Sequence, residues 1–173
     1  MLCKKLSHGA YRCKSAKETT EFYTQVLGLK LSHVMGADRV PSTQEFDPHI
    51  HIFFEMEDGS CIAFFEAPLS PGGIRDTGMR DWIQHFAFEV ADVETVMAAK
   101  ARLESLGLDV IGPTDHEGFF LSIYFHDPSG HRLELVAHTA TQEMKEIAHR
   151  EAPTLLERWS QHGSWAGNPP NSH

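Results

Sequence analysis

Three side chains that could support metal-dependent chemistry lie close together in the second half of the chain. They are His116, Tyr124 and Glu134, and the turn sequence Asp127-Pro128-Ser129-Gly130 separates the last two. Segments of alternating character flank this turn, so the pattern places the three side chains on neighbouring strands of one hairpin. A histidine, a tyrosine and a carboxylate at one place are the groups that a mononuclear metal oxygenase requires.

The elements that position these groups belong to a chain of 173 residues with a formal net charge of -9. That length suits a single domain with one core, which we expect to span residues 1–173. The acidic balance and the lack of a basic patch argue against a nucleic acid or an anionic membrane as partner. We therefore expect the partner to be a small molecule.

The cysteines and the N-terminal residues indicate a compartment. Cys3, Cys13 and Cys61 form no CxxC pair and, being three, cannot all pair internally, which favours a reducing environment. The first five residues have no apolar signal core after them, and no stretch reaches the roughly 18 apolar residues of a membrane span. We expect a soluble, cytoplasmic protein.

An internal repeat organises the chain. The segment EFYTQVLGLKL at 21–31 resembles the segment KARLESLGLDV at 100–110. In each, an amphipathic helix ends in Leu-Gly, where glycine suits a left-handed helix cap, and runs into a strand. Short alternating strands precede both helices, at 6–12 and 83–89, and further strand candidates follow. Both halves therefore predict an α+β fold, with two repeated βαβββ modules forming a cupped mixed sheet with outer helices.

The repeat also divides the chain into parts. A helix is expected from Thr141 to Arg150, with a further turn opened at Pro153. The loop at 37–47 is long for a strand connection and would cover the cleft. The expected parts are module 1 at about 4–68, a linker at 69–81, module 2 at about 82–138, a C-terminal helical extension at 139–163 and a tail at 164–173.

Strand alternation predicts which side chains face the inside of the cup. In the strand at 83–89, Phe86 and Phe88 pack beneath the helix, so His85 faces the other way. By the same parity Glu134 faces the cup between two packed leucines. Tyr124 lies on the side of its strand that is opposite to its apolar neighbours.

The register of the repeat suggests a metal site. His8 and His85 occupy the same place in the first strand of each module. Aligning the glycine turns of the two later hairpins sets Ala63 on Glu134, so that one module offers a methyl group and the other a carboxylate. A histidine in a strand is more often structural, but a buried carboxylate needs partners, and the three polar residues are best explained together.

A site of two imidazoles and one carboxylate would leave about three coordination positions open, the arrangement that suits Fe(II) or Mn(II) when a substrate and dioxygen bind the same ion. A further carboxylate would favour Lewis-acid proton-transfer chemistry instead. Glu66 is the nearest candidate, but its strand parity is opposite to that of Ala63. We therefore discount Glu66 as a ligand.

These residues resemble those of the vicinal oxygen chelate superfamily, the glyoxalase, bleomycin-resistance and extradiol dioxygenase fold. The resemblance covers residues 4 to about 138 and rests on the strings FYTQVLGL at 22–29 and YFHDPSGHRLEL at 124–135. Those strings are shared by many members, so they fix the fold more firmly than the activity. The longer pattern from Thr114 to Glu134 looks like the signature of type I extradiol ring-cleavage dioxygenases.

The resemblance implies a non-haem Fe(II), or Mn(II), held by His8, His85 and Glu134, with dioxygen as co-substrate. A catechol-like or hydroquinone-like aromatic would chelate the metal through two oxygens. Tyr124 would hydrogen-bond a substrate oxygen, and His116 would orient substrate at the pocket mouth; the alternatives are a half-buried strand tyrosine and a loop histidine. Members of the superfamily often dimerise and sometimes exchange modules, so a homodimer is expected.

One position departs from the dioxygenase pattern. Those enzymes carry an acid/base histidine three residues before the small residue equivalent to Ala63, and this chain has Ser60 there. His51, and less so His49, has cup-facing parity on the adjacent strand and could take that role. Both could equally be ordinary strand histidines.

Other functions remain open. A metal-dependent isomerase or lyase of glyoxalase or epimerase type would share the fold and metal but needs a second carboxylate, where this chain has Ala63. A metal-free binding protein of the bleomycin-resistance kind would leave Glu134 and the histidines without a shared purpose. A metal-binding member with a reaction other than ring cleavage is also compatible. Plausible pocket walls for an aromatic ring are Phe53, Phe65, Phe119, Phe120 and Tyr124.

Overall fold

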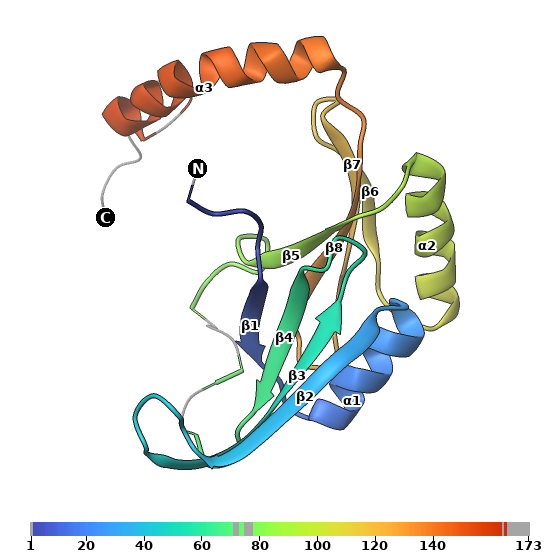
Figure 1. The fold of residues 1–173 in the computed structure, drawn as a ribbon. Coiled ribbons are helices and arrows are strands. Elements are labelled where there is room, and N and C mark those ends of the chain that lie inside the picture. The colour runs from blue at the N-terminus through green and yellow to red at the C-terminus, as the bar shows by residue number, and fades with distance from the viewer. Residues whose placement is uncertain (1, 71–72, 75–77, 164, 166–173) are drawn as a thin grey trace.

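The computed structural model describes residues 2–70, 73–74, 78–163 and 165. Its elements repeat in the two halves of the chain (Figure 1). Module 1 contains β1 (His8–Arg12), α1 (Ala16–Glu21), the π-helical turn η1 (Phe22–Val26), β2 (Lys30–Arg39), β3 (Phe46–Glu55) and β4 (Cys61–Glu66). Module 2 contains β5 (His85–Glu89), α2 (Val93–Ser105), β6 (Ile111–Asp115), β7 (Phe120–His126) and β8 (Arg132–His138), and α3 (Gln142–His162) follows. The predicted α+β class with two βαβββ modules is confirmed.

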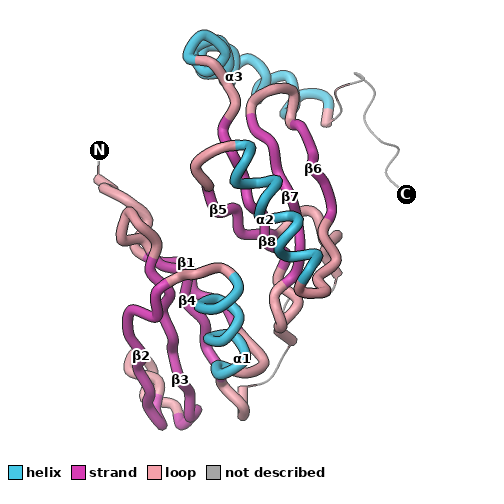
Figure 2. Tube along the Cα trace, turned by 90° about the vertical axis from the view of Figure 1, so that its right-hand side faces the viewer, coloured by secondary structure: helices cyan, strands magenta, loops and turns pink. Residues whose placement is uncertain are grey.

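Each module forms one four-stranded mixed sheet. The strand order is β1-β4-β3-β2 in module 1 and β5-β8-β7-β6 in module 2. The first pair of each sheet is parallel and the others are antiparallel. Among the described residues all strand pairing stays within a module, so two separate sheets stand where the repeat suggested one cupped sheet. Figure 2 shows both sheets with α1 and α2 on the same side.

The strand register reproduces the internal repeat. Ala10 pairs with Ala63 in module 1, and Ala87 pairs with Glu134 in module 2. Each of the two partner alanines comes two residues after the histidine that opens its strand. Ala63 and Glu134 therefore occupy equivalent places, as the alignment of the two hairpins predicts.

Local signals begin and end the helices. The Ser15 hydroxyl accepts a hydrogen bond of 3.2 Å from the backbone N–H of Glu18 at the start of α1, which is the first half of a capping box. Gly28 and Gly107 follow the two repeated helices with φ of 75° and 83°. These are the left-handed caps that the Leu-Gly repeat predicts.

The apolar faces of both sheets pack against α1, η1 and α2 in one core. Tyr23 is fully buried, stacks on Phe54 with ring centroids 5.1 Å apart, and donates a hydrogen bond of 3.2 Å to Asp127 of module 2. Burial, and then the charge of Asp127, raises the pKa of Tyr23, so its hydroxyl stays protonated. This buried bond joins the two modules.

Two segments differ from their predicted form. α3 runs unbroken from Gln142 to His162 with Pro153 inside it, where a helix ending at Arg150 was predicted; proline keeps a helical φ and removes only one backbone bond. The predicted loop at 37–47 shortens to 40–45, because β2 and β3 pair as far as Arg39 and Phe46. Apart from Trp165, the predicted tail lies outside the described residues.

Within the described ranges, the structure contains no helix that combines the length and the apolar character needed to cross a membrane.

Candidate metal centre

The open face of module 2 brings together two of the three predicted metal ligands. β5 and β8 run parallel, and alternation places His85 and Glu134 on the face that points away from the helices. His85 Nε2 lies 2.9 Å from Glu134 Oε2. An imidazole nitrogen and a carboxylate oxygen thus lie side by side. They are the donor pair that the sequence predicted for module 2.

Glu134 is a buried residue, with 4% of its surface exposed, and polar groups hold its carboxylate. The Ser122 hydroxyl donates a short hydrogen bond to Oε1, and the Tyr124 hydroxyl lies 3.3 Å from the same atom. These contacts offset part of the cost of burying a charge and fix the direction of the carboxylate. The strand register explains why the Ser122 side chain lies beside Glu134, because Ser122 comes two residues before Tyr124 on the same face of β7.

Tyr124 and His116, the two predicted catalytic residues of module 2, form a pair beside this carboxylate. His116 Nε2 lies 2.8 Å from the Tyr124 hydroxyl oxygen, and the histidine tautomer decides which group donates. Burial, and then the charge of Glu134, raises the pKa of Tyr124, so the phenol is protonated at neutral pH. His116 follows directly after β6, so the turn rather than the strand carries it.

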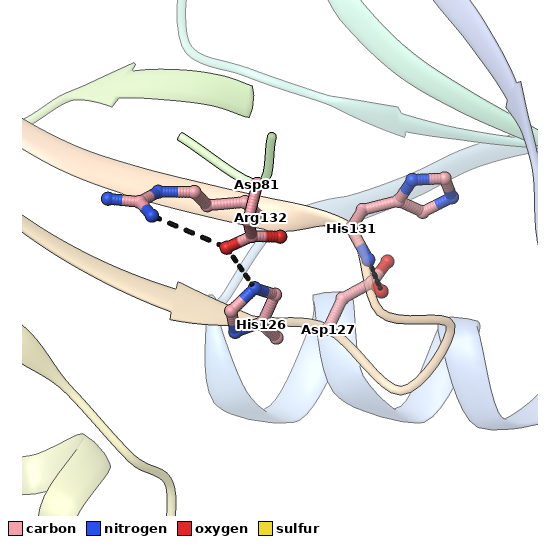
Figure 3. A network of polar contacts seen from close by, with 5 residues as sticks. All are labelled: Asp81, His126, Asp127, His131 and Arg132. Carbon is pink, nitrogen blue, oxygen red and sulfur yellow. Dashed lines mark hydrogen bonds and ion pairs between the residues drawn. The ribbon is translucent and has the colours of Figure 1, made fainter. Parts of the chain in front are cut away.

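A second polar network joins Asp81, His126 and Arg132 (Figure 3). Asp81 Oδ2 accepts from Arg132 Nη1 at 3.3 Å and lies 3.1 Å from His126 Nε2. The Arg132 guanidinium carbon is 4.3 Å from the centre of the Tyr124 ring, close enough for a cation–π contact. This network ties the end of the linker to β7 and β8. Sequence reasoning missed Arg132, although it shares the strand parity of Glu134.

A cavity of about 830 Å³ lies on the open face of module 2. His85, His116, Tyr124 and Glu134 are among its polar lining residues. Apolar side chains supply much of the rest, among them Phe120, one of the predicted pocket walls. The size and lining suit a small molecule with a few polar atoms.

Module 1 presents imidazoles and aromatic rings on the equivalent face. The His51 ring stacks on Phe65 with centroids 3.6 Å apart, and its centroid lies 4.0 Å from that of Phe53 and 6.1 Å from that of His8. His51 is 7% exposed, and its Nε2 atom has no hydrogen-bond partner among the described residues. Burial, and then the charges of neighbouring histidines, lowers the pKa of His51 to about 4, so it is neutral at neutral pH.

His49, the weaker candidate for an acid/base role, is already engaged. Its Nδ1 atom lies 2.7 Å from the backbone carbonyl oxygen of Asp47, which an N–H at that position would satisfy. The ring of His49 packs against Phe65 at a centroid distance of 5.7 Å. The ring of His49 is therefore held by a backbone contact, whereas the ring of His51 is held by stacking.

The third predicted ligand, His8, lies apart from the other two. Its ring packs on Phe53 of module 1, with centroids 5.3 Å apart, and its Nδ1 lies 3.2 Å from the Ser7 hydroxyl. Within the part of the chain that the structure describes, no three His, Cys, Asp or Glu side chains come close enough to share a metal ion. One chain thus places His85 and Glu134 together and leaves His8 on the other sheet.

The remaining positions on β4 add no carboxylate to this face. Ala63 is fully buried opposite Phe53. Glu66 Oε2 accepts a hydrogen bond of 2.6 Å from the backbone N–H of Ala16, on the helix side, as its parity predicts. Ser60 donates from its hydroxyl to Asp58 Oδ1 at 2.6 Å, and this bond lowers the pKa of Asp58.

One family model matches most of the chain. The family model described as the Glyoxalase/Bleomycin resistance protein/Dioxygenase superfamily matches residues 5–135, from before β1 to within β8. No curated protein matches the chain.

Solved structures with the same fold come from several sources. An integron cassette protein from the mobile metagenome of the Halifax Harbour sewage outfall is 26% identical, with 78% of this chain and 99% of that chain covered and a TM-score of 0.55. The fosfomycin resistance protein FosX of Listeria monocytogenes is 24% identical, with coverage of 83% and 98% and a TM-score of 0.60. The lactoylglutathione lyase of Agrobacterium tumefaciens is 19% identical, with coverage of 79% and 96% and a TM-score of 0.56.

Proposed function

The chain belongs to the glyoxalase/bleomycin resistance protein/dioxygenase superfamily, and on that basis we propose that it is a divalent-metal enzyme of the isomerase or lyase kind. Its metal is held by His85 and Glu134 of one chain and by His8 of a second copy. Its substrate is a small molecule whose two neighbouring oxygens reach the metal. The reaction is a proton transfer or an addition without net oxidation.

The contact of 2.9 Å between His85 Nε2 and Glu134 Oε2, beside an open cavity of about 830 Å³, carries this proposal. A buried carboxylate at such a cavity costs free energy unless donors or a cation satisfy it. Imidazole nitrogen and carboxylate oxygen together suit Mn(II) or Fe(II). The residues present therefore fit a divalent ion, which when bound would polarise a substrate oxygen as a Lewis acid.

A second copy is needed because one chain keeps His8 on the other sheet. The open face of module 1 carries His8 and the aromatic rings, and the open face of module 2 carries the carboxylate. If module 1 of one copy covers module 2 of the other, a two-fold dimer contains two equivalent sites. The homodimer is thus part of the proposed function.

Tyr124 and His116 would handle the proton in this site. The protonated Tyr124 hydroxyl can donate to a substrate oxygen on which negative charge develops, and His116 can supply or accept the next proton across their 2.8 Å contact. Arg132 holds the Tyr124 ring through its cation–π contact. The neutral imidazole of His51, with its unpaired Nε2, would face the substrate from the second copy.

Two considerations favour this chemistry over ring cleavage. A FosX structure contains Mn(II) and a dihydroxypropylphosphonic acid, and another similar structure is a lactoylglutathione lyase. Ser60 stands where the dioxygenases have an acid/base histidine, and its hydroxyl is engaged with Asp58. The absence of a second carboxylate at Ala63 leaves a three-residue donor set, which still supports Lewis-acid chemistry.

Fe(II)-dependent ring cleavage of a catechol-like or hydroquinone-like aromatic, with dioxygen as co-substrate, is the second candidate. The observation that favours it is the Tyr124 and His116 pair beside Glu134, which agrees with the pattern of the extradiol enzymes. In that reaction the same tyrosine would donate to an oxygen of the aromatic substrate.

Metal titration and oxygen uptake separate the candidates. Metal-free protein is loaded with Mn(II) or Fe(II) and assayed on hemithioacetals, epoxides and catechols, with oxygen consumption followed throughout. Turnover without oxygen uptake supports the isomerase or lyase reading, whereas oxygen uptake with catechols supports the dioxygenase. A protein that binds neither metal contradicts both. Glu89→Gln, which changes another carboxylate at the same cavity, is the matched control for Glu134→Gln.

A further inference from the structure

The C-terminal helix α3 is attached to the molecule at one end. Thr139 Oγ1 donates a hydrogen bond of 2.7 Å to the carbonyl oxygen of Gly118, and the backbone N–H groups of Thr139 and Ala140 donate to Phe119 O. The side chain of Thr141 then caps the helix by accepting from the N–H of Met144 at 3.2 Å. These bonds fix the direction in which α3 leaves β8.

Beyond this root, α3 makes no extended contact with any other described helix or strand. Figure 1 shows it running away from the sheets, toward the side opposite α1 and α2. That is the side on which the open faces of both modules lie. The helix therefore projects from the rim of the face that carries Glu134.

One side of this projecting helix is apolar. Helical spacing gathers its apolar residues on one half of the helix surface, together with Lys145, Glu151 and Arg158, and most of its other polar residues lie on the opposite half. Large members are well exposed, with 66% of Leu156 and 45% of Trp159 accessible. The apolar half consists of Met144, Ile147, Ala148, Ala152, Leu155, Leu156 and Trp159.

A helix of this kind needs a packing partner. Isolated helices are marginal in water, and most helical stability in proteins comes from packing of the apolar face. Pro153 lies inside α3 and removes a backbone hydrogen bond, at a cost of about 3 kcal/mol or more in a helix interior. An unsupported helix with such a break would lose its second half, so the apolar half must be covered.

We propose that α3 is a clasp that packs its apolar half on a second copy of this chain. The proposal rests on the proposed function, in which the second copy sits on the open faces beside which α3 projects. The charges of the described residues of α3 nearly cancel, and the whole chain has a formal net charge of -9. This charge balance does not suit binding to an anionic lipid surface. Exposed Trp82, Ile83 and Ile111 continue the apolar surface on the same face.

The test is the dimer dissociation constant of the full chain, measured by sedimentation velocity over a range of concentrations. Leu155→Glu places a charge on the apolar half, whereas Gln161→Glu places the same charge on the polar half. We expect Leu155→Glu to weaken the dimer by about 100-fold and Gln161→Glu to change it by less than about 3-fold. Circular dichroism checks that both variants keep the fold. We expect both to keep it, because α3 makes no extended contact with any other described helix or strand.

Three results would overturn the clasp, two of them in the sedimentation experiment. One is a wild-type chain that stays monomeric at high micromolar concentration, and the other is a Leu155→Glu dimer as tight as the Gln161→Glu dimer. Binding of the chain to neutral or anionic vesicles without dimers would assign α3 to lipid and also contradict the proposal. Metal titration of Leu155→Glu is carried out at concentrations where this variant is dimeric, so that it tests the metal site alone. A dimer that binds no metal would contradict the proposed function without bearing on α3.

Discussion

Modules 1 and 2 share strand order, register and helix caps, and they differ most at one equivalent position on their open faces. Ala63 of module 1 is fully buried opposite Phe53, whereas Glu134 of module 2 is a buried carboxylate that contacts His85. A methyl group needs no partner, but a carboxylate requires donors, and Ser122 and Tyr124 provide them. The two open faces therefore also differ at the facing position, since Phe53 lies opposite Ala63 and Tyr124 lies opposite Glu134.

The histidines of the two modules show the same contrast. His85 points at a carboxylate, while His8 packs on Phe53 and near the stacked ring of His51. Module 1 offers neutral imidazole and aromatic surface, and module 2 offers charge and a proton donor. Two faces with such complementary side chains can form one site only when they meet. Within one chain they do not bring three possible metal ligands together among the described residues.

Mixing two inactive variants tests this division most strongly. His8→Ala removes the donor of module 1, and Glu134→Ala removes the donor of module 2, so each alone should lower turnover by more than about 100-fold. In an equal mixture, half of the dimers are mixed and each has one intact site, so we expect about a quarter of wild-type activity to return. Activity is measured after subunit exchange. Sites formed within one chain would give no recovery.

Removal of the proton donor of module 2 should have the next largest effect. Tyr124→Phe deletes the hydroxyl that contacts His116 and Glu134, and we expect kcat to fall by about 100-fold with little change in metal affinity. Steady-state kinetics and metal titration measure the two quantities. Tyr11→Phe, which deletes a hydroxyl on module 1, serves as control. Equal losses in both variants would refute a proton-donor role for Tyr124.

Giving module 1 the carboxylate of module 2 should destabilise the protein. Ala63→Glu adds a charged side chain at a fully buried position opposite Phe53, where module 2 has the Tyr124 hydroxyl opposite Glu134, and we expect the free energy of unfolding to fall by about 2–4 kcal/mol. Chemical denaturation measures the change. Ala101→Glu on the exposed side of α2 should change stability by less than about 0.5 kcal/mol. An Ala63→Glu protein as stable as wild type would mean that the new carboxylate reaches water, which contradicts the full burial of this position.

A smaller effect should appear in the pH dependence of stability. The pKa of His51 is about 4 in the folded chain, below the ordinary value of about 6.5, so the unfolded chain binds this proton first. The stability that His51 contributes is present above pH about 6.5 and is lost as the pH falls toward 4. His51→Phe keeps a stacked ring but cannot titrate. The melting temperature of this variant should therefore rise relative to that of wild type as the pH falls from about 6.5 toward 4.

The exposed His149 of α3 provides the comparison for that experiment. His149→Gln replaces an exposed histidine and is measured at the same pH values as the control. For His51→Phe, a difference from wild type that does not change with pH would show that His51 titrates normally in the folded chain.

Much of the fold was predictable because its signals are local. The Leu-Gly repeat located two helix ends, and the left-handed Gly28 and Gly107 confirm them. Alternation assigned Phe88 to the core and Glu134 to the opposite face, since successive side chains on a strand point to opposite sides. The equivalence of Ala63 and Glu134 followed from the turns alone.

Other features depend on packing at a distance. The length of α3 past Pro153 could not be read from a residue that usually ends a helix, and Arg132 gained its place through Asp81 in the linker. The lowered pKa of His51 follows from rings contributed by β3 and β4 together. Each of these results depends on which strands lie side by side.

The sequence by itself determined the two modules, their register and the residue types on each open face, because period and turn chemistry are properties of short segments. Only the tertiary structure decided that His85 meets Glu134 at 2.9 Å, that His116 meets Tyr124, and that His8 stays on a separate sheet. Distances between modules depend on how the shared core around Tyr23 packs, and no local pattern in the sequence records that packing.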